Sequence, residues 1–174
     1  QIIKKYTNKI FVIDDLANRR HDCDVLLDQN LYENMYNRYN NLIPRSSKRL
    51  FGPKYAILRN EFINQRKDNK IANENIKSIF IFFGGTDHFN LTEITLRSLM
   101  VNKLSQLNFN VVIGKYNPNK ASIQQFSALY NNINLVIQTN EISKIMAKSD
   151  VAIGSGGSAI WEMCCLGLPS FIIS

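Results

Sequence analysis

The stretch over residues 150–169 constrains the fold more than any other part of the chain, because it combines the patterns of a strand, a turn, a helix and a signal that ends the helix. Residues 151–153 form a short apolar run that is typical of a buried strand. A glycine-rich turn over residues 154–157 follows directly. Glycine has no Cβ, so this turn allows another backbone or a ligand to approach closely.

The helix expected over about residues 159–166 has a start signal and a stop signal. Ser158 is a natural N-cap, Gly167 suits the C′ position, and Pro169 lies just beyond it. A helix start behind glycines presents free N–H groups and a partial positive charge, which favours an anion site, most often for phosphate. Glu162 lies one turn into the helix, where its carboxylate can accept hydrogen bonds from a ribose diol. The alternative interpretation is a tight turn followed by an ordinary acidic residue.

Composition and charge restrict the class of protein. The chain has 174 residues, 45% hydrophobic and 20% charged, as in a globular protein with enough side chains for a core. The formal charge of +7 is uneven: residues 1–77 hold 15 Lys and Arg against 9 Asp and Glu, whereas residues 78–174 hold 6 against 5. The half with the expected phosphate site has no basic stripe, so we expect no nucleic-acid partner. The sequence has no apolar run long enough for a membrane span.

The cysteines argue against a disulfide framework and against a metal site. Cys23, Cys164 and Cys165 are an odd number, and two of them are adjacent in an expected helix. Their spacing fits neither paired disulfides nor zinc ligands. We therefore expect reduced thiols, a cytoplasmic location, no metal and no cofactor.

From residue 78 onward, apolar runs and helical patterns alternate regularly. Asn90 followed by Glu93 is the capping pair expected to start the first helix. Five strands interleaved with four helices predict an α/β fold, a parallel Rossmann-like sheet with helices on both faces. The strands are expected over residues 78–83, 109–113, 134–137, 151–153 and 170–173, and the helices from residue 90 to about 100 and over residues 119–130, 141–149 and 159–166.

Two glycine turns follow strand ends in this half. Gly84-Gly85 follows the first expected strand, and Gly156-Gly157 follows the fourth. Ligands of a doubly wound sheet bind at that edge, so both turns are placed to meet one pyrophosphate, although they need not be neighbours. Neither turn has the Gly-x-Gly-x-x-Gly spacing of dinucleotide-binding folds, which makes an NAD enzyme a poor fit.

The first part of the chain is expected to be the tail of a second α/β domain. Short strands over residues 9–14 and 25–27 are too close together to build a sheet with its own core. Asp14 and Asp15 end the first strand, where acids either line a site or cap a following helix. The tyrosines at helical spacing, Tyr32, Tyr36 and Tyr39, are expected to form a packing face.

A linker is expected over residues 64–77, which are charged, rich in asparagine and free of long apolar runs. The predicted domains are therefore residues 1–75, the C-terminal part of an N-terminal domain with its linker, and residues 76–174, a Rossmann-like domain truncated at its end.

Several linked motifs resemble those of one enzyme family. Residues 156–162 (Gly-Gly-Ser-Ala-Ile-Trp-Glu) with residues 167–169 (Gly-Leu-Pro) resemble the nucleotide-sugar motif of GT-B glycosyltransferases, which include the bacterial lipid-II N-acetylglucosaminyltransferase. Residues 13–24, 27–30, 52–59 and 83–87 resemble those of the UDP-sugar hydrolases of pseudaminic acid biosynthesis, whose relatives are named for spore-coat polysaccharide synthesis. The resemblance covers essentially the whole chain.

The resemblance implies a GT-B-like, two-domain enzyme in which water attacks the anomeric carbon of a UDP-diacetamido-trideoxyhexose and UDP leaves. It assigns phosphate contacts to the turn around Ser155, ribose contacts to Glu162, and uracil contacts to the backbone around Ile142. The implied nucleotide-sugar-binding residues are Gly85, Thr86, Asp87, Ile142, Ser155, Gly156, Gly157, Ser158 and Glu162. The residues placed on the substrate side are Asp14, Asp15, Arg19 and His21.

The catalytic base of this family is a histidine in a glycine-rich loop near the start of the N-terminal domain. The chain has no such segment before Asp14, so no catalytic residue is assigned, and we expect this piece to bind a uridine nucleotide without normal turnover. Two alternatives remain open: a GT-B glycosyltransferase that uses a UDP-sugar donor, and a sugar-nucleotide-binding module that lacks catalysis.

Overall fold

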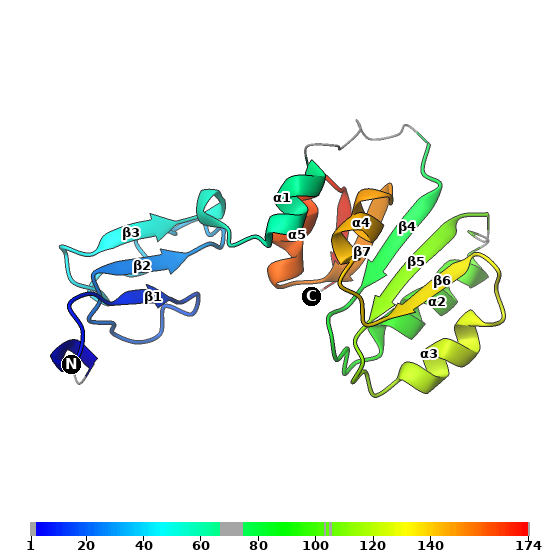
Figure 1. Cartoon of the computed structure of the whole chain (residues 1–174), viewed down its shortest axis with the longest axis horizontal. Helices are drawn as coiled ribbons and strands as arrows, with labels where there is room; N and C mark the ends of the chain where they lie inside the picture. The colour runs from blue at the N-terminus through cyan, green and yellow to red at the C-terminus, as the bar shows by residue number, and fades with distance from the viewer. Residues whose placement is uncertain (1–2, 67–74, 103, 105, 174) are drawn as a thin grey trace. The chain divides into compact units, whose positions relative to one another are not determined.

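In the computed structural model, which describes residues 3–66, 75–102, 104 and 106–173, eight strands form two separate parallel sheets (Figure 1). The chain divides into two units, Gln1–Ile57 and Leu58–Ser174, here called the first and the second unit. The division lies earlier in the chain than the boundary predicted after residue 75.

The second unit contains a five-stranded sheet in the order β6-β5-β4-β7-β8, with every neighbouring pair parallel. This arrangement confirms the predicted parallel Rossmann-like sheet. All five expected strands are present, within two residues of the predicted bounds. They are β4 (Ser78–Phe82), β5 (Asn108–Ile113), β6 (Ile133–Ile137), β7 (Val151–Ser155) and β8 (Ser170–Ile173).

Helices cover both faces of this sheet (Figure 1). Phe80, Met146 and Met163 belong to the buried cluster that includes side chains of α4 and α5, whereas Ile81, Leu96 and Ile123 belong to the cluster that includes side chains of α2 and α3. Alternate side chains of β4 thus enter opposite cores, as the pleat of a strand requires. The helices are α1 (Asn60–Arg66), α2 (Leu91–Val101), α3 (Lys120–Ser127), α4 (Ile142–Ala147) and α5 (Ser158–Leu166).

The strand order places the two glycine turns side by side. The central strand β4 pairs with both β5 and β7. From β4 the chain adds β5 and β6 on one side of the sheet and then adds β7 and β8 on the other side. Phe82, near the end of β4, pairs with Gly154 of β7. The turns that follow these two strands therefore lie at the switch point of the sheet, where α/β proteins bind ligands.

Helix α5 ends as predicted and starts one residue earlier. Gly167 takes a left-handed conformation with φ 66°, and the amide of Leu168 donates to the carbonyl of Met163 at 3.0 Å, which closes the helix. The N-cap is Gly157, with φ 122° and no side-chain cap hydrogen bond. The prediction that Ser158 caps the helix is therefore wrong, because Ser158 is already helical.

Asn90 is the N-cap residue of helix α2, as predicted, but its side chain makes no cap hydrogen bond, and another residue caps the first amides. The Asn90 amide group donates to Glu93 Oε2 at 2.9 Å, so that pair bonds side chain to side chain. The carboxylate of Asp87 accepts from the amides of Leu91 and Thr92, each at 2.9 Å. A carboxylate on the first helical amides also complements the helix dipole, so Asp87 is the residue that stabilises this helix start.

Helix α1 lies in the segment that the sequence predicted as a linker. It packs against α4 and α5 of the second unit, and its Phe62 is fully buried in their core. The hydrophobic pattern of seven residues is too short to stand out from the charged residues around it. Residues 67–74 of the predicted linker lie outside the described residues.

The first unit contains a parallel sheet in the order β1-β2-β3. Its strands are β1 (Phe11–Ile13), β2 (Val25–Asp28) and β3 (Lys48–Phe51). The prediction that this part builds no sheet with a core is wrong, because the basic segment before Phe51 supplies a third strand. A small core forms around Cys23, Leu26, Tyr39, Ile43 and Phe51.

The tyrosines of the first unit do not form the predicted packing face. Residues 33–42 are turns, and Tyr32 and Tyr36 are exposed. Tyr39 is fully buried, and its ring lies 5.2 Å from the ring of Phe51. Helical spacing alone therefore misplaced two of the three tyrosines.

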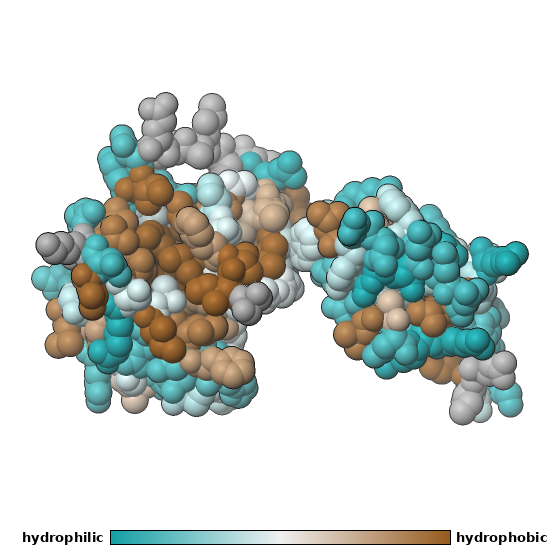
Figure 2. Space-filling view, turned by 180° about the vertical axis from the view of Figure 1, so that it is seen from behind, coloured by the Kyte–Doolittle hydropathy of each residue, from teal (hydrophilic) through white to brown (hydrophobic). Residues whose placement is uncertain are grey.

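Hydrophobic residues also gather on one face of the second unit (Figure 2). Phe171, Ile172 and Ile173 of strand β8 are exposed. Among the described residues, the structure contains no helix that is both long and apolar enough to cross a membrane.

Candidate functional site

A cleft of about 330 Å³ opens in the second unit at the carboxyl ends of β4, β5 and β6, a volume within the range of small-molecule sites. Strands β4 and β5 supply its floor, and α4 and α5 begin at its wall. The residues that line the cleft are Arg59, Phe82, Gly85, Val112, Ile113, Gly114, Gln138, Thr139, Ile142, Ser158, Ala159 and Glu162.

The first turns of α5 give the cleft its polar side. Ser158 and Ala159 begin this nine-residue helix behind an N-cap glycine, so its first amides receive no side-chain cap. Glu162 follows one turn later, and its side chain is 12% exposed. The cleft thus combines N–H donors with a carboxylate acceptor, the groups needed for a phosphate and a sugar hydroxyl.

Arg59 brings a positive charge to the same cleft. Its Nε donates to Glu162 Oε1 at 2.9 Å. A second ion pair joins its guanidinium to Glu61 Oε1, also at 2.9 Å. The hydrogen bond to Glu162 raises the pKa of Arg59 above its ordinary value, so the guanidinium stays charged.

The opposite end of the cleft is formed after strand β6. Gln138 has a left-handed φ of 55°, which is uncommon for a residue with a side chain. Its amide donates to the carbonyl of Ile113 at 2.9 Å, which ties this turn to β5. Thr139 and Ile142 line the wall, and the Thr139 hydroxyl accepts from the Glu141 amide at 2.9 Å. This end of the cleft combines the side chains of Gln138 and Thr139 with the apolar side chain of Ile142.

Gly114 fixes the position of the turn after β4. A Cβ on Gly114 would lie 2.0 Å from the carbonyl oxygen of Gly85. The two backbones therefore touch, and Gly85 is held against the end of β5. A Cβ on Gly85 or Gly156 would meet no other atom within 4 Å, so open space lies beside both residues.

The structure brings together four of the predicted nucleotide-binding residues in the cleft. These are Gly85, Ile142, Ser158 and Glu162. The residues Thr86, Asp87, Ser155, Gly156 and Gly157 are not among those that line it. Of these, Asp87 is buried and uses both carboxylate oxygens on α2.

The sequence interpretation missed Arg59, Gly114, Gln138 and Thr139 as cleft residues. Gly114 and Gln138 follow the strands β5 and β6, so a systematic search of every strand end would have found them. Arg59 carries no such signal, because it reaches the cleft only through the packing of α1.

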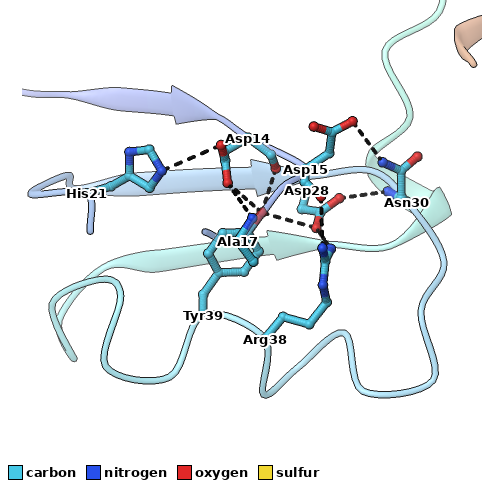
Figure 3. Close-up of polar contacts among 8 residues, drawn as sticks. All are labelled: Asp14, Asp15, Ala17, His21, Asp28, Asn30, Arg38 and Tyr39. Atoms are coloured by element: carbon cyan, nitrogen blue, oxygen red, sulfur yellow. Dashed lines mark hydrogen bonds and ion pairs between the residues drawn. The ribbon is translucent and has the colours of Figure 1, made fainter. Parts of the chain in front are cut away.

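A cluster of charged side chains occupies the strand ends of the first unit (Figure 3). We call Asp14, Asp28, Arg38 and Tyr39 the carboxylate cluster. The Tyr39 hydroxyl lies 2.8 Å from the Asp14 carbonyl oxygen, 3.0 Å from Asp14 Oδ2 and 3.2 Å from Asp28 Oδ2. Arg38 Nη1 donates to Asp28 Oδ2 at 2.5 Å.

Both carboxylates of the cluster also accept hydrogen bonds from backbone amides. Asp14 Oδ2 accepts from the Ala17 amide at 3.0 Å, and Asp28 Oδ1 accepts from the Asn30 amide at 3.1 Å. Burial opposes the ionisation of Asp14, but the bonds from Ala17 and Tyr39 outweigh it and hold the pKa of Asp14 below its ordinary value. Burial and the two carboxylates together raise the pKa of Tyr39.

The residues predicted on the substrate side belong to this cluster or surround it. His21 Nε2 lies 3.6 Å from Asp14 Oδ1, and Arg19 Nη2 lies 3.8 Å from the same oxygen. Asp15 is exposed and accepts from the Asn30 amide group at 3.4 Å. Their contact with a substrate remains a prediction. Within the part of the chain that the structure describes, no three His, Cys, Asp or Glu side chains are grouped to hold a metal ion.

Known proteins are similar to this chain over most of its length. The UDP-2,4-diacetamido-2,4,6-trideoxy-beta-L-altropyranose hydrolase of Campylobacter jejuni is 34% identical over 95% of this chain and 58% of its own length. The spore coat polysaccharide biosynthesis protein SpsG of Bacillus subtilis is 26% identical over 71% of this chain and 36% of its own length. The chain thus spans little more than half of the first relative and about a third of the second.

The match to a family covers most of the second unit, which holds the cleft. Residues 79–174, more than half of the chain, match the glycosyltransferase family 28 C-terminal domain. This range contains strands β5 to β8, all of β4 except Ser78, both glycine turns and the start of α5. The chain therefore belongs to the glycosyltransferase family 28 C-terminal domain family.

Proposed function

We propose that the cleft of the second unit binds the UDP portion of a UDP-sugar, in a protein that hydrolyses a UDP-diacetamido-trideoxyhexose for nonulosonic (pseudaminic) acid or polysaccharide biosynthesis. The observation that carries the proposal is the common cleft of Glu162 and the uncapped start of α5 at the switch point of the sheet. The similarity to the Campylobacter jejuni hydrolase supports the choice of substrate.

Each part of UDP has a complementary group in this cleft. The backbone N–H groups of the turn over residues 155–158 meet the phosphates, and Glu162 accepts from the ribose hydroxyls. The backbone around Ile142 meets the uracil. Gly85, which lines the cleft on the turn after β4, contacts the ligand from that side.

The reaction needs a stabilised leaving group. A water oxygen bonds to the anomeric carbon and releases one proton to the solvent, while the bond from that carbon to the β-phosphate oxygen breaks and UDP departs with the electron pair. Negative charge then grows on the pyrophosphate, next to the positive end of α5 and its N–H groups. Electrostatic stabilisation of this kind lowers the barrier, because the donors are already oriented.

Calorimetric titration tests the binding proposal. The protein is titrated with UDP, UMP, GDP and NAD, and selective binding of UDP is the expected result. Glu162→Ala removes a charged acceptor, so it is expected to weaken UDP binding by about 1–3 kcal/mol. Glu33→Gln removes one negative charge from an exposed position of the first unit and serves as the matched control. Equal binding of GDP, or an unchanged affinity in Glu162→Ala, would refute the assignments.

A glycosyltransferase is the second candidate, because the family match is to a glycosyltransferase domain. The two functions differ in what accepts the sugar. Incubation of the UDP-sugar with the full-length protein, with and without candidate acceptors, separates them. Release of UDP and free sugar without an acceptor identifies a hydrolase, whereas UDP release that requires an acceptor identifies a transferase. Absence of both with intact UDP binding identifies a binding module.

A further inference from the structure

Arg59 enters the cleft from outside the predicted nucleotide motif. It lies directly before α1, and the packing of this helix on α4 and α5 carries Arg59 to Glu162, 103 positions away in the sequence. Its Nε bonds a single oxygen of Glu162, Oε1, at 2.9 Å. Within the described residues, Glu162 Oε2 accepts no hydrogen bond.

Three contacts hold the guanidinium in place before any ligand arrives. Besides the bond to Glu162, Arg59 pairs with Glu61 Oε1 at 2.9 Å. Its Cζ lies 4.8 Å from the ring centroid of Phe62, within the range of a cation–π contact. Phe62 is fully buried, so the ring is a fixed support. Arginine suits this role because its planar group makes several directed bonds at once.

Arg59 is the positive partner of the Glu162 carboxylate and fixes its orientation. Its side chain is 12% exposed, and a carboxylate so far removed from water needs a positive partner. Arg59 supplies this partner and restricts the carboxylate to one orientation. Because Oε1 is occupied, the second oxygen is left as the acceptor for a ligand.

We propose that Arg59 is a positioning residue that orients Glu162 for a ribose hydroxyl and so makes the cleft selective for ribonucleotides over deoxyribonucleotides. This inference rests on the proposed binding of UDP. Arg59 acts through Glu162: its Nε holds Oε1, and Oε2 accepts from the 2′- or 3′-hydroxyl of the ribose. A direct contact between Arg59 and a phosphate is the competing role, because 54% of its side chain is exposed.

The two roles differ in the ratio of two dissociation constants, that of a deoxy analogue and that of UDP. Each is measured by calorimetry with UDP, 2′-deoxy-UDP and 3′-deoxy-UDP. A hydrogen bond to a charged group gives the unsubstituted protein a ratio of about 10 or more for at least one analogue. Arg59→Gln is expected to lower that ratio to about 3 or less, as Glu162→Gln does. A loss of long-range attraction for phosphate changes both constants equally and leaves the ratio unchanged.

Two further variants complete the test. Arg66→Gln removes the same charge from an exposed position of α1 and is expected to keep the ratio of the unsubstituted protein. The double variant Arg59→Gln/Glu162→Gln is expected to match Glu162→Gln within about twofold, because both residues act through one interaction. The fluorescence of Trp161, next to Glu162, reports whether α5 keeps its packing in each variant.

The possible failures can be told apart. No UDP binding by the unsubstituted protein overturns the proposed function. UDP binding with a ratio near 1 for both analogues overturns the assignment of the ribose to Glu162, and with it the role of Arg59. A high ratio that survives in Arg59→Gln overturns the positioning role alone, and an equal weakening of UDP and its deoxy analogues then assigns Arg59 to the phosphates.

Discussion

The two units place polar groups at the carboxyl ends of parallel strands, and they use them in opposite ways. In the first unit, Asp14 and Asp28 are buried, and their oxygens accept from Tyr39, Arg38 and nearby amides (Figure 3). In the second unit, Glu162 borders an open cleft, and among the residues that the structure describes only one of its oxygens accepts a hydrogen bond. The same position in the fold therefore holds a closed network in one unit and an open site in the other.

The helix starts of the second unit repeat this contrast. Both α2 and α5 follow glycine turns after neighbouring strands. The carboxylate of Asp87 occupies the first amides of α2, whereas the first amides of α5, behind Gly157, receive no side-chain cap. A strand-end position thus indicates a binding site only when its donors and acceptors are not already used by the protein.

The largest effect is expected from breaking the closed network at Asp28. Asp28→Asn removes the charge that pairs with Arg38, whose side chain is 13% exposed. Removal of one partner from a buried ion pair is expected to lower the free energy of unfolding of the first unit by about 3 kcal/mol or more. Affinity for UDP is expected to stay the same, because the cleft belongs to the second unit.

Each unit has its own probe for this experiment. The thiol of Cys23 is buried in the first unit, so its alkylation rate in rising denaturant, followed by peptide mass spectrometry, measures the opening of that unit. The fluorescence of Trp161 reports the second unit. Asp15→Asn, at the end of the same sheet but exposed, is the control and is expected to change stability by less than about 0.5 kcal/mol. An equally small effect of Asp28→Asn would contradict a structural role for the cluster.

A smaller effect is expected from adding one methyl group to the open site. Gly114→Ala puts a Cβ against the backbone of Gly85, which cannot move as a side chain does. Overpacking of this kind is expected to cost about 2 kcal/mol and to displace the turn after β4. Gly156→Ala is the control, because its Cβ meets nothing within 4 Å. Trp161 fluorescence in denaturant measures both, and equal stability of the two variants would refute the close approach.

Much of the second unit could be predicted from the sequence. The alternation of apolar runs and helical patterns located all five strands of its sheet, since buried parallel strands consist almost entirely of apolar residues. The glycine turn and Glu162 were recognised because strand, turn and helix are adjacent in the chain. Predictions from local patterns of this kind agree with the structure to within a residue or two, as at the N-cap of α5, which is Gly157 and not Ser158.

The rest depends on contacts between distant residues. Strand β3 is basic and was not recognised, because its pairing with β2 and the burial of Phe51 decide its conformation. Tyr39 was expected beside Tyr32 and Tyr36, yet its hydroxyl bonds two carboxylates from other segments. The pair between Arg59 and Glu162 likewise follows from helix packing alone.

The smallest effect is expected from the single hydroxyl at the centre of the closed network. Tyr39→Phe keeps the buried ring but removes one donor from Asp14 and Asp28, at an expected cost of about 1 kcal/mol. Burial and the two carboxylates raise the pKa of Tyr39, so the folded first unit keeps the phenol protonated at pH values where the unfolded chain loses the proton. The stability that comes from this difference is fully present below about pH 10, the ordinary pKa of tyrosine, and is lost as the pH rises above it.

The difference in stability between the unsubstituted protein and Tyr39→Phe is therefore expected to shrink as the pH rises from about 10 to about 11. The other tyrosines of the chain are the same in both proteins, so their contributions cancel in this difference. The alkylation rate of Cys23 in denaturant measures it at each pH, with the rate in the fully unfolded chain as the reference for thiol ionisation. A difference that stays constant over this range would mean that the Tyr39 hydroxyl reaches water, and the cluster would then be as open as the cleft.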